Sequence, residues 1–165
     1  LGSSRTNEIR MIDLEKGGSP IDVITGFKAY YSGITLDTVL YIRTNEDAPN
    51  YKIMSINLKN PQRKNWIEVV PESDDLMESF TIIDRKLVMH YLHNAHSQVK
   101  IYSRNGRHLK DIQLPTLGTV MGFSGRWDDD EMYLSFTSFI YPTTHYRYDF
   151  NANELNEYYL SLIHI

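Results

Sequence analysis

The sequence predicts an all-β protein assembled from repeated four-stranded antiparallel sheets. Short apolar segments that close on Asp or Asn recur every 44 to 48 residues, and a second strand-like segment recurs in step with them. No stretch of 12 residues combines a 3.6-residue apolar period with helix caps. Four short strands in a repeat of about 45 residues are typical of one blade of a β-propeller.

Two landmarks define the repeat. The first is the apolar segment that closes on Asp or Asn, and the second is a strand-like segment that recurs in step with it. The first landmark occupies Ile9–Asp13, Ile53–Asn57, Val99–Asn105 and Tyr146–Asp149, and the second occupies Val39–Asn45, Leu87–Asn94 and Met132–Ser138. Because two independent landmarks share one period, coincidence is a poor explanation of the repeat.

Each repeat has the local pattern of strands and turns. Some strands, such as Leu87–Leu92, are apolar on both faces, which is expected of a sheet packed between two others. Asn105-Gly106 suits a two-residue hairpin, because both central positions of that turn need a positive φ. The turn signals between strands are Gly17-Gly18, Leu36-Asp37, Asp84-Arg85, Asn105-Gly106 and Asp128–Asp130.

The repeat divides residues 1–159 into about three and a half blades. We expect a partial blade over 1–27 and blades over 28–75, 76–118 and 119–159. A propeller closes with about four to eight blades, so the sequence predicts part of a larger propeller. A β-sandwich of many short strands is the structural alternative, but it does not explain the repeat.

Both ends of the chain look cut. The sequence starts Leu1-Gly2-Ser3-Ser4 without an initiator methionine, which suggests an internal fragment. The last residues, 160–165 (LSLIHI), resemble the translation of a transposase adapter used in sequencing libraries, and we exclude them from fold reasoning as a non-native tail. An amphiphilic terminal strand is the alternative interpretation of this tail.

Composition excludes several classes of function. Seventeen Lys and Arg against 21 Asp and Glu give a net charge of −4, so we expect neither nucleic acid nor a membrane as a partner. The chain has no cysteine, which excludes a disulfide framework, a thiolate zinc site and a cysteine nucleophile. The absence of cysteine does not indicate the cellular compartment.

Ser124 gives the nearest approach to a serine nucleophile. It lies between Gly122 and Gly125, but the nucleophile elbow needs its second glycine one residue later and a helix after the turn. We therefore expect a serine in a hairpin turn.

His90, His93 and His96 invite a metal interpretation, but strand residues three apart point to opposite faces. We expect a half-buried strand histidine followed by two loop histidines, with no metal and no cofactor. The acidic run Asp128–Glu131 lacks the ligand spacing of a calcium loop and is expected to be a solvated hairpin tip.

Several segments, in order from about Asn7 to Tyr159, resemble signatures of the prolyl oligopeptidase propeller. The related oligopeptidase B family is less similar at Asp47–Pro49 and Leu114-Pro115. The matching segments are Thr44–Pro49, Asn65–Glu72, His90–Ala95, Leu114–Val120, Gly122–Gly125, Phe136–Phe139 with Pro142, and Tyr146–Asp149.

This resemblance implies a seven-bladed propeller that covers an α/β-hydrolase domain, in a serine peptidase that cleaves short peptides after proline. The implied triad lies in the hydrolase domain, outside this chain, so no catalytic residue is expected here. The implied partners are short proline-containing peptides and that hydrolase domain. A stand-alone propeller that binds proteins or peptides is the alternative function, and a sugar-processing propeller enzyme would need a pair of carboxylates that we do not identify.

The family resemblance implies roles for only a few residues of this chain. Some family members line the substrate pocket from the propeller with an Arg and a Cys, and the resemblance places these positions at Glu8 and Ile12. Glu in place of Arg would reverse a local charge. Asn94 also replaces the Asp that usually precedes the alanine in this segment.

Overall fold

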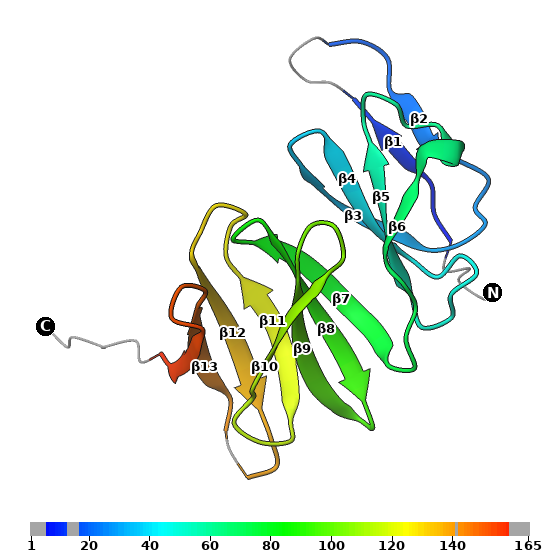
Figure 1. The fold of residues 1–165 in the computed structure, drawn as a ribbon. Coiled ribbons are helices and arrows are strands. Elements are labelled where there is room, and N and C mark those ends of the chain that lie inside the picture. Colours follow the sequence, from blue (N-terminus) through cyan, green and yellow to red (C-terminus); the bar gives the residue numbers. More distant parts are fainter. Residues whose placement is uncertain (1–5, 13–16, 141, 159–165) are drawn as a thin grey trace, which may run out of the picture. The chain divides into compact units, whose positions relative to one another are not determined.

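The computed structural model describes residues 6–12, 17–140 and 142–158 and divides the chain into two compact units, Leu1–Asp74 and Asp75–Ile165 (Figure 1). The described residues form β-strands and one short 3₁₀ helix. Within them, no helix is long and apolar enough to cross a membrane. The predicted non-native tail 160–165 and the opening residues Leu1–Ser4 lie outside the described residues.

The first unit contains two antiparallel sheets. One has two strands in the order β1-β2, and the other has four strands in the order β3-β4-β5-β6. The elements are β1 (Ile9–Met11), β2 (Ile21–Ile24), β3 (Tyr31–Leu36), β4 (Val39–Thr44), β5 (Lys52–Asn57), the 3₁₀ helix η1 (Arg63–Asn65) and β6 (Ile67–Val70).

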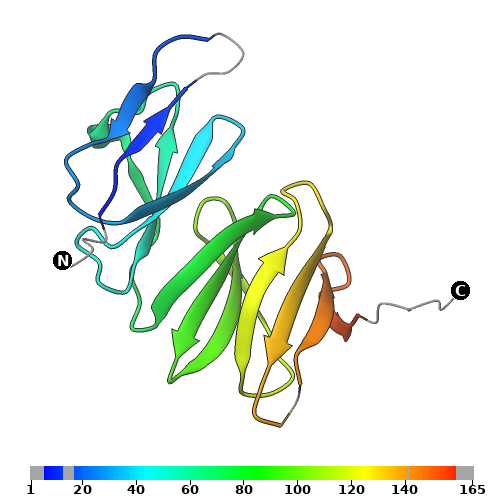
Figure 2. The same cartoon turned by 180° about the vertical axis from the view of Figure 1, so that it is seen from behind.

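The second unit contains two four-stranded antiparallel sheets, with the orders β7-β8-β9-β10 and β11-β12-β13-β14 (Figure 2). The prediction of an all-β fold built from four-stranded antiparallel sheets is therefore confirmed. The strands are β7 (Leu76–Ile83), β8 (Lys86–His93), β9 (His96–Tyr102), β10 (His108–Ile112), β11 (Thr119–Ser124), β12 (Glu131–Thr137), β13 (Thr144–Asp149) and β14 (Glu154–Glu157).

A hydrophobic cluster joins the two sheets of the second unit. Strand β12 shows how the sequence builds it, because its buried side chains alternate with half-buried ones along the strand. Each fully buried Leu, Met or Phe stabilises the packed sheets by about 1.5–3 kcal/mol. The cluster consists of Ile83, Val88, Val99, Ile101, Ile112, Val120, Met132, Leu134, Phe136, Tyr146, Tyr148 and Phe150.

The first unit has a smaller cluster of the same kind, to which both of its sheets contribute. Ile24 comes from β2, and the remaining residues come from the four-stranded sheet or the segment that leads into it. The buried members are Ile24, Ala29, Tyr31, Leu40, Ile42 and Ile56.

One hairpin turn matches the turn predicted from the sequence, and another differs from it. Asp84 and Arg85 have φ of 49° and 52° and join β7 to β8 in two residues, as their turn signal indicates. The prediction of a two-residue hairpin at Asn105-Gly106 is wrong. A five-residue loop joins β9 to β10 there, closed by the Ser103 N–H, which donates to the Arg107 carbonyl at 2.9 Å. The Gly106 N–H also donates to the Ser103 carbonyl at 2.9 Å, so the loop is held by two hydrogen bonds in place of a two-residue turn.

Candidate functional site

Glu8 and Ile12 flank strand β1. The Glu8 carboxylate accepts the backbone N–H of Gly26 at 2.8 Å, and its other oxygen lies 3.9 Å from Nη2 of Arg10. Arg10 also contacts Asp22 on β2, with 2.8 Å between Nε and Oδ1. The structure thus gives Glu8 a local role in joining the ends of the β1–β2 hairpin. Ile12 is 46% exposed. The pocket role of these two positions stays a prediction.

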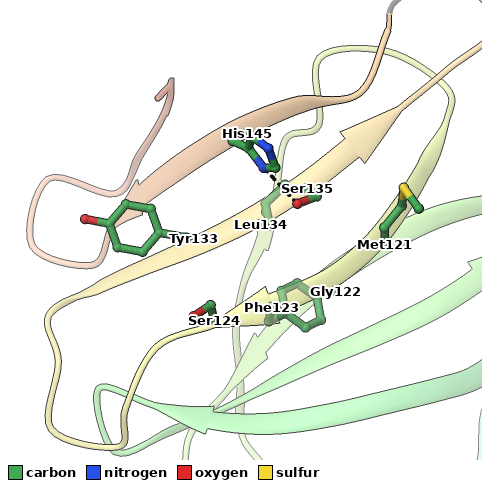
Figure 3. A pocket seen from close by; sticks show the side chains of 8 residues that line it. All are labelled: Met121, Gly122, Phe123, Ser124, Tyr133, Leu134, Ser135 and His145. Carbon is green, nitrogen blue, oxygen red and sulfur yellow. Dashed lines mark hydrogen bonds between the residues drawn. The ribbon is translucent and has the colours of Figure 1, made fainter. Parts of the chain in front are cut away.

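Ser124 is the last residue of β11 and lies opposite Tyr133 of β12. A turn and another strand follow it, which is the strand–turn–strand context that the sequence indicates. It lines a hollow of about 330 Å³ on the β11–β14 sheet (Figure 3). The residues that line the hollow are Met121, Gly122, Phe123, Ser124, Tyr133, Leu134, Ser135 and His145.

A hydroxyl–imidazole pair, which sequence reasoning missed, lies in the same hollow. Oγ of Ser135 is 2.9 Å from Nδ1 of His145, and the two residues face each other across β12 and β13 (Figure 3). Both side chains lie on the surface. The residues are ten apart in sequence, and only the hairpin register brings them together. Their pairing across adjacent strands is sufficient to explain the contact.

The three histidines have different environments. His90 is buried, with Nε2 2.7 Å from Oγ of Ser97 and Nδ1 3.7 Å from the Glu78 carboxylate. Burial lowers the pKa of His90 below its ordinary value, and the nearby Glu78 carboxylate opposes this shift only in part. His90 is therefore a neutral core histidine at pH 7.

His93 and His96 are strand residues, so the prediction of loop histidines is wrong. They end β8 and begin β9 across a two-residue turn in which Asn94 and Ala95 have φ of 45° and 64°. Their rings meet edge to face, with 5.4 Å between centroids. Across the part of the chain that the structure describes, no group of three His, Asp or Glu side chains could hold a metal ion.

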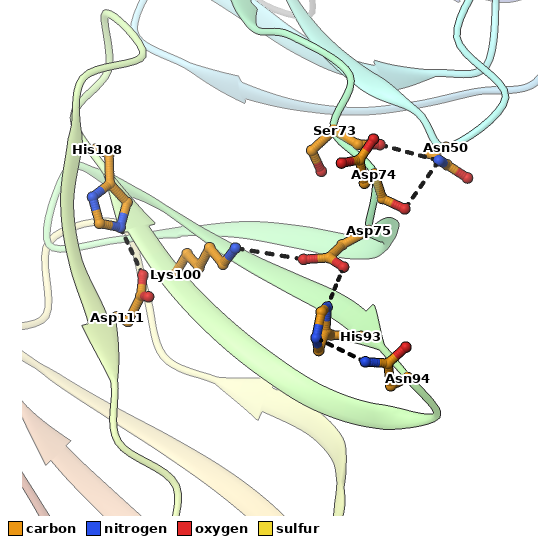
Figure 4. A network of polar contacts seen from close by, with 9 residues as sticks. All are labelled: Asn50, Ser73, Asp74, Asp75, His93, Asn94, Lys100, His108 and Asp111. Carbon is orange, nitrogen blue, oxygen red and sulfur yellow. Dashed lines mark hydrogen bonds and ion pairs between the residues drawn. The ribbon is translucent and has the colours of Figure 1, made fainter.

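Asp75 is the centre of a polar network at the start of β7 (Figure 4). One carboxylate oxygen lies 2.5 Å from Nδ1 of His93, and the other lies 3.7 Å from Nζ of Lys100. Nε2 of the same imidazole lies 3.0 Å from the Asn94 side-chain amide. Both ring nitrogens of His93 are therefore occupied, which suits a structural clamp on the hairpin rather than a general base.

The acidic run lies at an exposed turn. The Asp129 carboxylate accepts the Arg126 N–H at 2.7 Å, and Asp128 pairs with the Arg126 guanidinium at 3.3 Å. At the start of β12, Glu131 pairs with Arg147 at 3.1 Å. These carboxylates stabilise the turn and the neighbouring strand pair.

Comparison with known proteins identifies the family. The model of the prolyl oligopeptidase N-terminal β-propeller domain matches residues 1–159. The chain belongs to the prolyl oligopeptidase family. The match spans the repeats in which the sequence resembles this family and confirms that resemblance.

Other members of the prolyl oligopeptidase family are similar along most of the chain. The prolyl endopeptidase of Elizabethkingia meningoseptica is 31% identical over 153 residues, which are 92% of this chain and 22% of that protein. The dual-function macrocyclase-peptidase of Amanita bisporigera is 29% identical over 160 residues, 91% of this chain and 21% of that protein. The chain therefore spans about a fifth of the length of these relatives.

Solved structures of prolyl oligopeptidases share the fold. A structure from an analysis of two prolyl endopeptidases superimposes with a TM-score of 0.81 at 27% identity, covering 85% of this chain and 21% of the other. Prolyl oligopeptidase B of Galerina marginata gives a TM-score of 0.85 at 24% identity, covering 94% of this chain and 23% of the other. The likeness to prolyl oligopeptidase B, at 24% identity, supports the fold alone.

Proposed function

We propose that this chain is part of the propeller of a prolyl oligopeptidase-type serine peptidase that hydrolyses short peptides after proline. The observation that carries the proposal is the 31% identity to a prolyl endopeptidase over 92% of the chain. The chain corresponds to 22% of that relative, so the catalytic Ser, Asp and His belong to a hydrolase domain elsewhere in the parent protein.

The role of this part is to control access. Stacked sheets joined by apolar clusters form a rigid wall, as the cluster between β8 and β12 shows within the second unit. Such a wall over an active site admits short peptides and keeps folded proteins out. It also keeps bulk water away, which strengthens electrostatic stabilisation of the transition state.

Glu8 and Ile12 are proposed as positions that face the substrate, because the resemblance places pocket residues there. If this is right, Glu8→Gln in the parent enzyme changes the KM for charged peptides more than the KM for neutral ones. An equal loss for all peptides would instead support the local role of Glu8 at Gly26.

The alternative is a stand-alone propeller that binds protein or peptide ligands without catalysis. It is favoured if the parent reading frame holds further propeller repeats and no hydrolase domain. The two proposals are separated by the sequence of the parent gene together with one assay.

The assay uses purified parent protein and a short chromogenic peptide that ends in proline before the chromophore. We expect cleavage of this peptide, at least about tenfold slower cleavage of the matched alanine peptide, and inactivation by a serine-directed phosphonate. A parent protein with no G-x-S-x-G elbow and no cleavage would overturn the peptidase proposal.

A further inference from the structure

The loop between β9 and β10 contains a reactive dipeptide. Asn105-Gly106 is the one Asn-Gly pair in the sequence, and every other asparagine precedes a residue that has a side chain. Asn105 is exposed, and Gly106 is half-buried. Gly106 has a φ of 85°, in the region that favours glycine, so the backbone of this loop requires glycine after the asparagine.

Ser103 holds the two groups of this dipeptide that can react with each other. Its carbonyl accepts the Gly106 backbone N–H at 2.9 Å. Its hydroxyl donates to Oδ1 of Asn105 at 2.5 Å, whereas the Arg107 carbonyl, the other acceptor in reach, lies farther away at 3.2 Å. The same Oγ accepts the Arg107 N–H at 3.1 Å, which orients the hydroxyl hydrogen away from that donor. The Gly106 nitrogen and the Asn105 side-chain amide are thus both fixed on one residue.

These hydrogen bonds favour attack of the Gly106 nitrogen on Cγ of Asn105. The bond to Oδ1 stabilises the negative charge that develops on this oxygen when a nucleophile adds to Cγ. The bond from the Gly106 N–H to a carbonyl raises the electron density on the nitrogen. Because glycine has no Cβ, no side chain of residue 106 blocks the approach. The loop therefore holds a nucleophile next to a polarised electrophile.

We propose that Asn105 is a site of spontaneous deamidation that the Ser103 hydroxyl promotes. The Gly106 nitrogen gives up its proton to solvent and forms a bond to Cγ of Asn105. The bond between Cγ and the side-chain nitrogen breaks, and this nitrogen takes up a proton and leaves as ammonia. The product of this step is a five-membered cyclic imide.

One water molecule then opens the imide ring. Addition of water at Cγ gives an aspartate at position 105, and addition at the main-chain carbonyl carbon gives an isoaspartate. No group is oxidised or reduced. Both products place a carboxylate between Arg104 and Arg107, whose positive charges favour it. The isoaspartate also lengthens the main chain of the loop by one carbon atom, so the modification changes both the charge and the length of the β9–β10 connection.

Incubation of the purified parent protein in water enriched in heavy oxygen tests the site, because each ring opening places solvent oxygen in the product. Peptide mass spectrometry gives the rate of labelling at each asparagine, in the native protein and in urea. We expect Asn105 to react about three- to tenfold faster in the native protein than in urea, since the fold supplies the bond from Ser103. A native rate equal to or below the rate in urea would refute the promotion.

Two exposed asparagines serve as controls in the same sample. Asn60 precedes Pro61, which has no N–H to give up, and Asn151 precedes Ala152, whose Cβ hinders the approach. We expect no label at Asn60 and labelling of Asn151 at least about tenfold more slowly than of Asn105. Equal rates at Asn105 and Asn151 would contradict the assignment of Asn105 as a distinct site.

The hydroxyl is tested by a matched pair of variants in the parent protein. Ser103→Ala removes the donor to Oδ1 and keeps the backbone carbonyl that holds Gly106. The native rate at Asn105 should fall about three- to tenfold, while the rate in urea stays unchanged. Ser103→Thr keeps a hydroxyl and should retain most of the native rate. An unchanged native rate in Ser103→Ala, or an equal loss in both variants, would show that the hydroxyl does not promote the reaction.

Discussion

Gly118 lies directly against the ring of Phe136. A Cβ atom on residue 118 would be 2.5 Å from Cζ of that ring, and it would also collide with the backbone carbonyl oxygen of Thr137. The two sheets of the second unit meet next to this point, where the Gly118 carbonyl accepts the Ser97 N–H. Glycine is therefore required here for close packing.

Gly118→Ala should destabilise the protein by about 1–3 kcal/mol, because a backbone carbonyl cannot move aside as a side chain can. Gly33→Ala is the matched control. Its nearest neighbour is the flexible end of Leu40, at 2.9 Å, and we expect a smaller loss. Urea unfolding of both variants measures the difference. Equal midpoints would show that the Phe136 contact relaxes freely.

Leu134→Ala removes a nearly fully buried side chain from the cluster between the sheets and should cost about 2–5 kcal/mol. Ile67→Ala, at a position that is 64% exposed on β6, should cost less than about 1 kcal/mol. Calorimetric unfolding gives both values. A small loss at Leu134 would contradict tight packing of β12 on the β7–β10 sheet.

His90 makes stability depend on pH. Its native pKa is lowered by burial, so on acidification the unfolded chain takes up a proton before the native state does. Stability is therefore complete above the ordinary histidine pKa of about 6.5 and falls as the pH drops below it. The Glu78 carboxylate faces the ring and weakens this effect.

We expect His90→Gln to flatten the acid side of the stability curve, whatever its effect at pH 8. The measurement is the urea midpoint at several pH values between 8 and 5. His108→Gln, at an exposed imidazole that pairs with Asp111 at 2.7 Å, is the control. The control should keep the acid slope of the unmodified protein. If His90→Gln also keeps that slope, the buried histidine is not the source of the acid dependence.

Tyr31 makes the stability of the protein depend on pH in the alkaline range, in the direction opposite to that of His90. Its hydroxyl donates to the Glu46 carboxylate at 3.0 Å, and burial followed by this bond raises the pKa of Tyr31 to about 12. A raised pKa means stability that is complete below pH 10 and is lost as the pH rises toward 12. Arg63 pairs with the same carboxylate at 2.8 Å.

Tyr31→Phe should lower stability at pH 7 by about 0.5–1.5 kcal/mol and remove part of the alkaline loss. Absorbance titration at 295 nm follows tyrosine ionisation directly, since the variant should lose one of the latest titrating groups. Loss of an early titrating group instead would contradict the Tyr31–Glu46 bond.

The fold could be predicted because it depends on a repeated pattern. Alternating side chains in Met132–Thr137 and the doubly apolar Leu87–Leu92 report burial on one or two sheet faces, which is local information. The turn at Asn94-Ala95 escaped prediction because alanine is seldom found at a positive φ, so no turn signal marks it.

The polar contacts could not be predicted in the same way. Ser135 meets His145, and Glu8 meets Gly26, because of hairpin registers that the residue types alone do not determine. The Glu8 contact also depends on a register shift between Ile9 and Arg10. The residue types indicate which side chains are candidates for a functional site, whereas the strand register determines which of them are in contact.

In every described sheet, each strand pairs with the strand directly before or after it in the chain. This order has a consequence for synthesis. Loop-closure entropy is small when partners are near in sequence, so a sheet can form once about 40 residues have left the ribosome. The nascent protein can therefore fold sheet by sheet during translation, and each folded sheet provides a surface on which the next sheet packs.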